Sequence, residues 1–319
     1  SPLLDRKCIA KIRAGWIAYP LHASSSMNIF FSPKWGLFFL IIVWFCWGFS
    51  YPATKITLRG FDVWTSRLII MAAGGFLLLC LAKLNKEQIQ VRRDDWWDLI
   101  LASIFNMTIF QLGMTLGVHF FSAGRTVVIV YTMPLWAMLF AWILLKETPS
   151  RRQLYGLGLG LLGLFFLMGQ DFKDLPHAYL GATCTLVGAI SFGLGTVWMK
   201  RKKWRNNPTV IAGWQLVLGS LPVIPFWFFL GEETNWNELT PDIWASFLFL
   251  ILIANVLAYF AWFRVLSIFP ASISGLGTLA VPIVGLLASY LILNEILGWH
   301  EIVAATLIVT ALFFIFRQT

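Results

Sequence analysis

The sequence contains little charge. Aspartate, glutamate, lysine and arginine make up 12% of its 319 residues, whereas soluble domains carry about 25%. Hydrophobic residues make up 59%, and the mean hydropathy is +0.76. A helix needs roughly 20 apolar residues to cross a hydrocarbon core about 30 Å thick, and such runs fill most of this chain. The composition therefore excludes a soluble globular protein and predicts an all-α membrane protein.

Catalytic and metal-binding motifs are also missing. The four cysteines form no CxxC pair, and three of them lie within apolar segments, so we interpret them as packing thiols and not as a disulfide framework or metal site. The chain has no HExxH, P-loop or nucleophile elbow. This excludes an ATP-driven pump on this chain alone. It also argues against an intramembrane enzyme, which would need convergent catalytic groups. We therefore expect no enzyme, no metal and no cofactor.

One stretch imitates a nucleotide-binding motif. Residues 158–163, GLGLLG, match the GxGxxG pattern, but no strand precedes them and the segment is a long apolar run. Small residues spaced four apart let two helices approach closely. We therefore expect Gly156 and Gly160, like Gly113 and Gly117, to pack against neighbouring helices.

Charged residues divide the chain into ten apolar segments of spanning length. The candidate spans are residues 36–56, 63–83, 97–120, 123–145, 153–170, 178–199, 209–230, 242–265, 270–293 and 299–316. We expect residues 1–35 to be a cytoplasmic leader outside the fold, without the continuous apolar core of a secretory signal. The first methionine is Met27, which leaves open whether residues 1–26 are native.

Lysine and arginine are distributed unevenly between the loops. The leader, the loops after the even-numbered candidate spans and the C-terminus hold 19 of the 24 basic residues, and positively charged loops stay in the cytoplasm. This bias predicts cytoplasmic N- and C-termini, which requires an even number of spans. It also explains the net charge of +9 better than nucleic-acid binding does.

Two segments of the chain repeat in register. Residues 127–147 read VVIVYTMPLWAMLFAWILLKE and residues 275–295 read GLGTLAVPIVGLLASYLILNE, so a shift of 148 aligns both the proline and the final glutamate. Upstream, WGFSYPATK (47–55) resembles FGLGTVWMK (192–200). Each half holds five spans, an odd number, so the second half enters the membrane from the opposite side. We expect two inverted five-helix repeats, 36–170 and 178–316, around a central cavity, as in many secondary transporters.

These residues resemble the drug/metabolite transporter (DMT) superfamily and, within it, the EamA-type carriers. The resemblance covers residues 36–316 and rests on WGxxxxxxK at the end of the first span, on Arg67 early in the second, and on the repeated proline and glutamate. It implies a ten-helix carrier that moves small metabolites by alternating access through a central cavity. Members export amino acids, exchange nucleosides or sugars, or import vitamins, so the resemblance leaves the substrate open.

The repeated prolines are candidate hinges. A proline inside a helix frees backbone polar groups that lipid cannot satisfy. We therefore expect Pro134 and Pro282 to kink spans four and nine next to the cavity. The alternative is a packing kink that neighbouring helices satisfy.

Aromatic and amide side chains near mid-membrane predict a substrate-binding site. The shift of 148 aligns Gln111 with Tyr259, and polar side chains at that depth are costly. Helical spacing also groups aromatic residues on single faces of spans one and eight. The predicted substrate-binding residues are Trp44, Tyr51, Gln111, Tyr131, Asn255, Tyr259 and Trp262. The alternative is that the aromatics fill a bundle core and Gln111 bonds a neighbouring helix.

Charged residues near the span ends have two interpretations. Glu147 and Glu295 each end a helix, where the helix dipole disfavours a carboxylate. We expect each to find a partner, such as a neighbouring helix N-terminus or a basic residue, in a structural latch, with proton carriage as the alternative. Three cations could hold a carboxylate: Lys55, Arg67 and Arg125. We favour the alternative that they snorkel to lipid headgroups or pair with Asp62.

The expected function is secondary transport across the bacterial inner membrane. We expect a monomer in the lipid bilayer that exports small organic metabolites, amino acids or related compounds, by alternating access. Import or exchange of another metabolite, such as a nucleoside, vitamin or sugar derivative, is the alternative within carriers. A channel would line its path continuously with polar groups, which the interrupted aromatic pattern does not favour. Transport direction and coupling ion stay open, since no acidic residue lies at mid-span.

Overall fold

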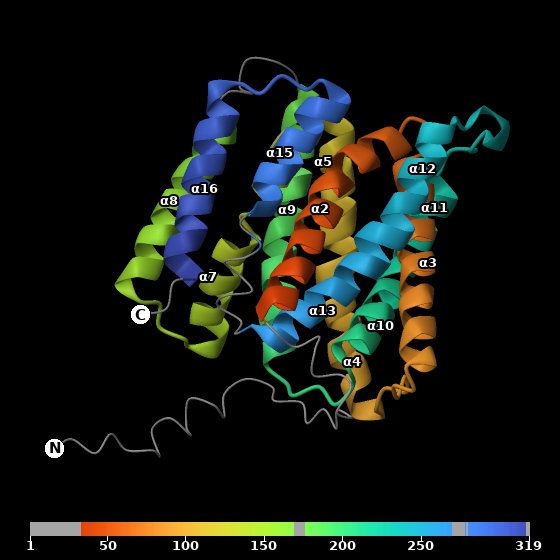
Figure 1. The fold of residues 1–319 in the computed structure, drawn as a ribbon, viewed down its shortest axis with the longest axis horizontal. Helices are drawn as coiled ribbons and strands as arrows, with labels where there is room; N and C mark the ends of the chain where they lie inside the picture. Colours follow the sequence, from red (N-terminus) through yellow and green to blue (C-terminus); the bar gives the residue numbers. More distant parts are fainter. Residues whose placement is uncertain (1–32, 169–175, 270–277, 279, 317–319) are drawn as a thin grey trace.

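The computed structural model describes residues 33–168, 176–269, 278 and 280–316, and within them every regular element is helical. The main helices, labelled in Figure 1, are α2 (Pro33–Thr57), α3 (Val63–Leu84), α4 (Trp96–Ser103), α5 (Phe110–Phe120), α6 (Ala123–Val130), α7 (Met133–Leu145), α8 (Arg151–Met168), α9 (Pro176–Lys200), α10 (Pro208–Ser220), α11 (Val223–Leu230), α12 (Pro241–Phe249), α13 (Ala258–Ile268), α15 (Ala280–Leu293) and α16 (Trp299–Phe316). Two π-helical segments, η3 (Ile104–Ile109) and η6 (Leu250–Leu257), and two 3₁₀ turns, η2 (Arg93–Asp95) and η5 (Trp236–Glu238), complete the list.

The described helices make the chain an integral, multi-pass membrane protein. Seven stretches are long and apolar enough to cross a membrane: Lys34–Thr57, Val63–Leu84, Arg93–Phe120, Ala123–Leu145, Tyr179–Lys200, Pro208–Leu230 and Pro241–Val265. Two shorter apolar helices, Ala280–Leu293 and Trp299–Phe314, follow. The seven stretches correspond to predicted spans one to four and six to eight, and the two shorter helices to spans nine and ten.

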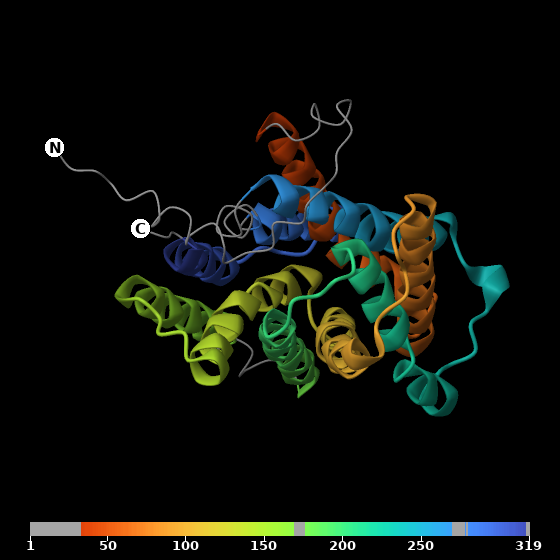
Figure 2. The same ribbon diagram turned by 90° about the horizontal axis from the view of Figure 1, so that it is seen from below.

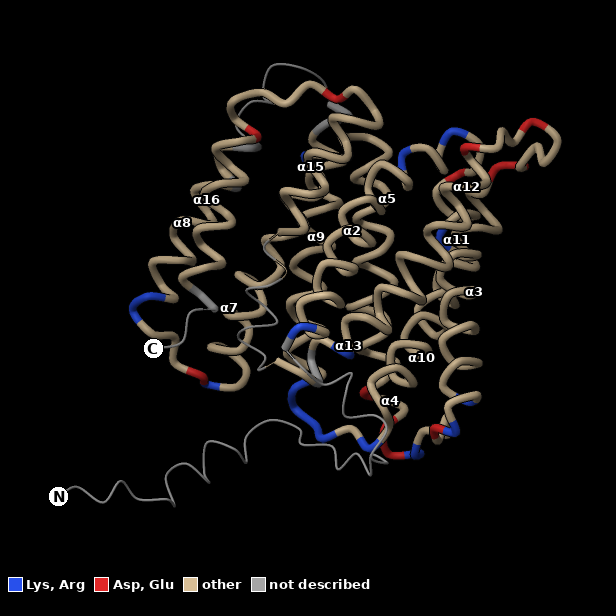
Figure 3. Tube along the Cα trace, in the orientation of Figure 1, with Lys and Arg blue, Asp and Glu red and all other residues tan. Residues whose placement is uncertain are grey.

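Charged residues gather at the two ends of the bundle, with few between them (Figure 3). We call one end the basic end, because it carries the loops after α3, α7 and α9 with their lysines and arginines. At this end Lys202 donates hydrogen bonds to Asp98 and to the backbone oxygen of Asp94, and its ammonium lies 2.6 Å from Asp95 Oδ1. The contact with Asp95 raises the pKa of Lys202.

Helices from the two halves of the chain pack together throughout the bundle. α8 packs along α16 at one edge of the molecule, and α3 packs along α10 and α11 at the other (Figures 1 and 2). Between these edges α2 contacts α13 and α15, while α9 contacts α5 and α7. The fold therefore has no boundary that separates an N-terminal from a C-terminal half.

Small residues set the distance between α5 and α9. A β-carbon added at Gly113 would collide with the backbone oxygen of Cys184, and one added at Gly117 would collide with Thr185 Oγ1. Gly160 of α8 meets Leu135 of α7 in the same way. The predicted close packing through these three glycines is confirmed.

Two spans contain a π-helical segment, which the sequence analysis did not predict. η3 joins α4 to α5, and η6 joins α12 to α13. The shift of 148 carries residues 104–109 onto 252–257, which lie inside η6. A π turn disturbs the regular ladder of backbone hydrogen bonds and occurs often at functional sites. Gln111 and Tyr259 are each the second residue of the α-helix that follows.

The two repeated prolines, Pro134 and Pro282, lie near helix starts and not in mid-helix. The fourth predicted span is two helices, because α6 ends at Val130 and α7 begins at Met133 after a turn at Tyr131 and Thr132. Pro134 is in the first turn of α7, where a missing N–H removes no helical bond. Pro282 is the third residue of α15, and most residues just before that helix are outside the described part of the chain. The expected kink is thus a break between two helices in span four.

The ends of α7 and α15 have matching geometry. Each helix is followed by a residue with positive φ, Lys146 at 56° and Asn294 at 53°. The next residue is the repeated glutamate in both cases. Its N–H donates to the carbonyl oxygen six residues earlier, at 3.3 Å from Glu147 and 3.5 Å from Glu295. The aligned positions therefore share a backbone conformation at the end of the helix.

Candidate substrate cavity

A cavity of about 670 Å³ lies inside the bundle. Residues from α2, α3, α5, α7, α9 and α13, and from η6, line it. Glu147, Thr148, Pro149, Gln153 and Lys200 line it as well, and these belong to the basic end of the molecule. The cavity therefore extends from the middle of the bundle to the basic end.

One wall of the cavity is aromatic. The ring of Trp47 lies 6.1 Å from that of Tyr259 and 5.7 Å from that of Trp262, so α2 and α13 share one aromatic cluster. Across the cavity, Phe110 and Phe192 have ring centroids 4.7 Å apart. Aromatic walls with a few polar groups are typical of sites for small organic molecules.

The polar part of the cavity centres on Arg67. Its side chain is only 2% exposed. Nη2 donates to Thr54 Oγ1 at 2.9 Å, and Nη1 donates to Gln111 Oε1 at 3.4 Å. Ser50, Tyr51, Tyr131 and Asn255, all buried, also line the cavity.

Six of the seven predicted substrate-binding residues line the cavity. They are Tyr51, Gln111, Tyr131, Asn255, Tyr259 and Trp262. Trp44 does not; it is half-buried against the hydrophobic core that includes Val127 and Leu135. Pro134 and Glu147 also line the cavity, whereas Pro282 is buried and is not among the lining residues. Whether these residues bind substrate stays a prediction.

Sequence reasoning passed over several lining residues. Trp47, Phe192 and Thr196 lie in the two similar segments WGFSYPATK and FGLGTVWMK, where Trp47 aligns with Phe192 and Tyr51 with Thr196. Comparing the aligned polar and aromatic positions would have found these residues. The sequence left Arg67 either to hold a carboxylate or, as we favoured, to snorkel or pair with Asp62, but Asp62 caps α3 by accepting hydrogen bonds from the backbone of Trp64 and Thr65.

The end of the bundle opposite the basic end is closed by contacts between helices. Glu295 accepts hydrogen bonds from the backbone N–H groups of Ala123 at 2.8 Å and of Gly124 at 2.9 Å, one on each carboxylate oxygen, and so caps α6. Arg125 pairs with Glu301, whose side chain is 3% exposed. Of the two partners that we expected for Glu295, a neighbouring helix N-terminus or a basic residue, the hydrogen bonds are to the helix N-terminus. Its role as a latch stays a prediction.

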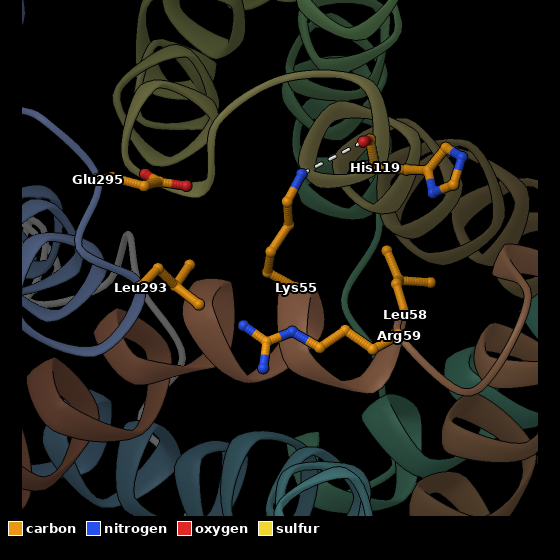
Figure 4. A pocket seen from close by; sticks show the side chains of 6 residues that line it. All are labelled: Lys55, Leu58, Arg59, His119, Leu293 and Glu295. Atoms are coloured by element: carbon orange, nitrogen blue, oxygen red, sulfur yellow. Dashed lines mark hydrogen bonds between the residues drawn. The ribbon is translucent and has the colours of Figure 1, made fainter. Parts of the chain in front are cut away.

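A second, smaller pocket of about 330 Å³ lies at this closed end. Lys55 stands in its middle and donates to the backbone oxygens of Val118, His119 and Phe121, which end α5 (Figure 4). Glu295 and His119 lie on opposite sides of Lys55. Lys55 thus ties α2 to α5 instead of extending to a lipid headgroup. Among the residues that the structure describes, no group of three or more His, Cys, Asp or Glu side chains could hold a metal ion.

The fold defines a multi-pass membrane protein with an internal cavity, and sequence comparison assigns its family. The chain belongs to the EamA-like transporter family, whose model matches residues 34–169 and again residues 179–317. The resemblance to the drug/metabolite transporter superfamily is thereby confirmed.

Curated relatives cover nearly the same length as this chain. The uncharacterized transporter YoaV of Bacillus subtilis (strain 168) is 25% identical over 86% of this chain and 94% of its own length. Protein PecM of Dickeya dadantii (strain 3937) is 26% identical over 83% of this chain and 87% of its own length. A solved crystal structure with 16% identity superposes with a TM-score of 0.63 over 88% of this chain and 96% of its own, which shows a shared fold.

Proposed function

We propose that this protein is a secondary carrier that moves small organic metabolites across the bacterial inner membrane by alternating access. The observation that carries the proposal is the cavity of about 670 Å³, which both halves of the chain line with aromatic and buried polar side chains. A carrier needs such a chamber near the middle of the membrane, open to one side at a time. Membership of a transporter family agrees with this function.

In this proposal the carrier consists of ten helices in two inverted repeats, residues 36–170 and 178–316. Equivalent contacts support it. Gly48 of α2 packs against Val284 and the backbone of Gly285 in α15, and Gly193 of α9 packs against residues 136 and 137 of α7. The shift of 148 carries 136 and 137 onto 284 and 285. The same shift of 148 relates the two π segments and the glutamates after α7 and α15. The family model also matches each half of the chain separately.

The described conformation corresponds to the state that is open to the cytoplasm, in a protein with both termini on the cytoplasmic side. Two observations support this assignment. The cavity reaches the basic end, which positive loops assign to the cytoplasm. Two contacts hold the opposite end together: Glu295 accepts a backbone hydrogen bond from the N-terminus of α6, and Arg125 forms an ion pair with Glu301. We infer that Glu295 is the latch of the outer gate and that Glu147 serves the inner gate.

The substrates that we propose are amino acids or related compounds, moved outward, by a monomer. An aromatic wall beside amide and hydroxyl groups suits a small molecule with both an apolar and a polar part. Import or exchange of a nucleoside, vitamin or sugar derivative is the alternative with the same fold.

Counterflow in proteoliposomes tests the proposal. Purified protein is reconstituted into proteoliposomes that contain an unlabelled amino acid, and uptake of the same amino acid in labelled form is measured. Exchange-stimulated uptake identifies a carrier, whereas a channel gives flux that internal substrate does not accelerate. We expect Gln111→Ala and Tyr259→Ala to lower this uptake at least tenfold while both variants still fold and insert into the membrane. Wild-type flux in both variants would remove these two residues from the site.

A further inference from the structure

Arg67 is an unusual residue for its position in the bundle. It is the fifth residue of α3 and is 2% exposed, so the surrounding helices bury its guanidinium at the wall of the cavity. Its two hydrogen bonds within the described chain go to neutral groups, Thr54 Oγ1 at 2.9 Å and Gln111 Oε1 at 3.4 Å. The Nε atom has no hydrogen-bond partner among the described residues.

No carboxylate neutralises this buried charge within the described chain. The ion pairs there join Arg59 to Asp242, Arg92 to Asp94, Arg125 to Glu301, and Lys202 to Asp95 and Asp98. A guanidinium has five N–H donors, and a buried charge without a partner is costly, more so inside a membrane protein. A glutamine could hydrogen-bond Thr54 and Gln111 without that cost. The charge therefore needs a reason other than holding α2, α3 and α5 together.

We propose that Arg67 binds the carboxylate of the transported molecule, so that the substrates are small organic monocarboxylates, including zwitterionic amino acids. This inference rests on the proposed carrier function. Arg67 lines the cavity, and its planar fork matches a carboxylate in a bidentate geometry. The substrate then supplies the missing negative charge, while its organic body lies against Trp47, Tyr259 and Trp262.

The number of charges in the cavity favours a carboxylate over a phosphate. Among the described lining residues the charged side chains are Arg67, Glu147 and Lys200, and the last two belong to the basic end. The inner part of the cavity thus offers one cation beside neutral amides, hydroxyls and aromatic rings. One guanidinium balances one negative charge, whereas a phosphate dianion requires a second cation at the same depth.

Ligand-induced thermal stabilisation of the purified full-length protein tests this inference. The probes are L-phenylalanine, L-leucine and 3-phenylpropionate, each beside its amide, with phenyl phosphate and adenosine as ligands of other chemistry. We expect carboxylates to stabilise the wild type and the matched amides to have no effect at the same concentration, because only a ligand that binds the folded state shifts its melting. In Arg67→Gln we expect the affinity for carboxylates to fall about 10- to 100-fold.

Two further variants keep the test interpretable. Arg92→Gln removes an exposed arginine from the basic end and should bind carboxylates like the wild type. Arg67→Lys keeps the charge but loses the bidentate fork, and should bind with intermediate affinity, which provides the readout if Arg67→Gln fails to fold. The ligand-free melting temperature of Arg67→Gln should not fall, since the variant removes an unpaired buried charge.

Defined outcomes overturn the inference. Equal stabilisation by acids and amides, carboxylate binding unchanged in Arg67→Gln, stabilisation by phenyl phosphate or adenosine alone, or no stabilisation by any carboxylate would each do so. Counterflow separates this inference from the proposed function. Counterflow of adenosine that Arg67→Gln leaves intact would keep the carrier and refute the carboxylate site. Arg67-dependent carboxylate binding without counterflow of any probe would refute the carrier and keep the site.

Discussion

Removing the carboxylate of Glu295 should release the closed end of the bundle. Glu295 accepts one backbone hydrogen bond on each oxygen, from Ala123 at 2.8 Å and from Gly124 at 2.9 Å. Hydrogen bonds to charged groups are worth about 1.5–3 kcal/mol each, and these are only partly buried, so we take the lower value. Glu295→Ala should then weaken the closed end by about 3 kcal/mol, or about 100-fold in the equilibrium between the two gate states.

Accessibility of a cysteine in the cavity measures that equilibrium. Met138 lines the cavity and is half-buried, so Met138→Cys, in a chain whose native cysteines are replaced by alanine, reports which side is open. A membrane-impermeant maleimide is applied to oriented proteoliposomes from either side. The parent should react from the cytoplasmic side, and Glu295→Ala should raise the rate from the outside about 100-fold at most.

Glu295→Gln is the matched control for this experiment. The amide keeps the size of the side chain and one acceptor oxygen but loses the charge, so its effect should be smaller, about tenfold. If Glu295→Ala left the outside labelling rate unchanged while the protein stayed folded, the cap would be a local packing feature and not a gate. The inference that Glu295 is the latch would then fail.

Two further predictions use pairs of equivalent or contrasting positions. Glu147→Ala should shift the labelling of Met138→Cys toward the cytoplasmic side, opposite in sign to Glu295→Ala, and a shift of the same sign would contradict the paired-gate model. Gly113→Ala should destabilise the protein by about 1–3 kcal/mol in a thermal or denaturant assay, because its β-carbon meets the backbone of α9. Gly158→Ala, where nothing lies within 4 Å, should be neutral or slightly stabilising; equal losses in both variants would refute the packing argument.

The sequence was informative where a feature depends on composition or on repetition. Apolar runs located the membrane-spanning helices, because hydrocarbon thickness fixes their length. The shift of 148 aligned Gln111 with Tyr259, and both residues line the cavity. Two glutamates at equivalent positions, each after a helix end, predicted a helix N-terminus or a basic residue as a partner, and Glu295 has the first of these.

Features that depend on depth and on side-chain direction escaped prediction. Trp44 shares a helical face with Tyr51, but it lies two turns, about 10 Å, farther along α2, so periodicity alone could not show that it misses the cavity. The π segments change the backbone register inside continuous, mostly apolar spans, and this change leaves no mark on hydropathy. Arg67 turns inward because the polar partners Thr54 and Gln111 come from two other helices.

The two ends of the bundle can be understood as one motif used twice. α7 and α15 both end in a residue with positive φ followed by glutamate, so the two carboxylates start from the same local geometry. In the described conformation Glu295 is bound to α6, while Glu147 is exposed and lines the cavity. By the shift of 148, the residues equivalent to Ala123 and Gly124 are 271 and 272, which lie outside the described part of the chain. If one latch forms as the other opens, each transition exchanges one set of charge-assisted hydrogen bonds for another, so the free-energy difference between the two states stays small. A substrate that binds Arg67 then needs only modest differential affinity to drive the exchange.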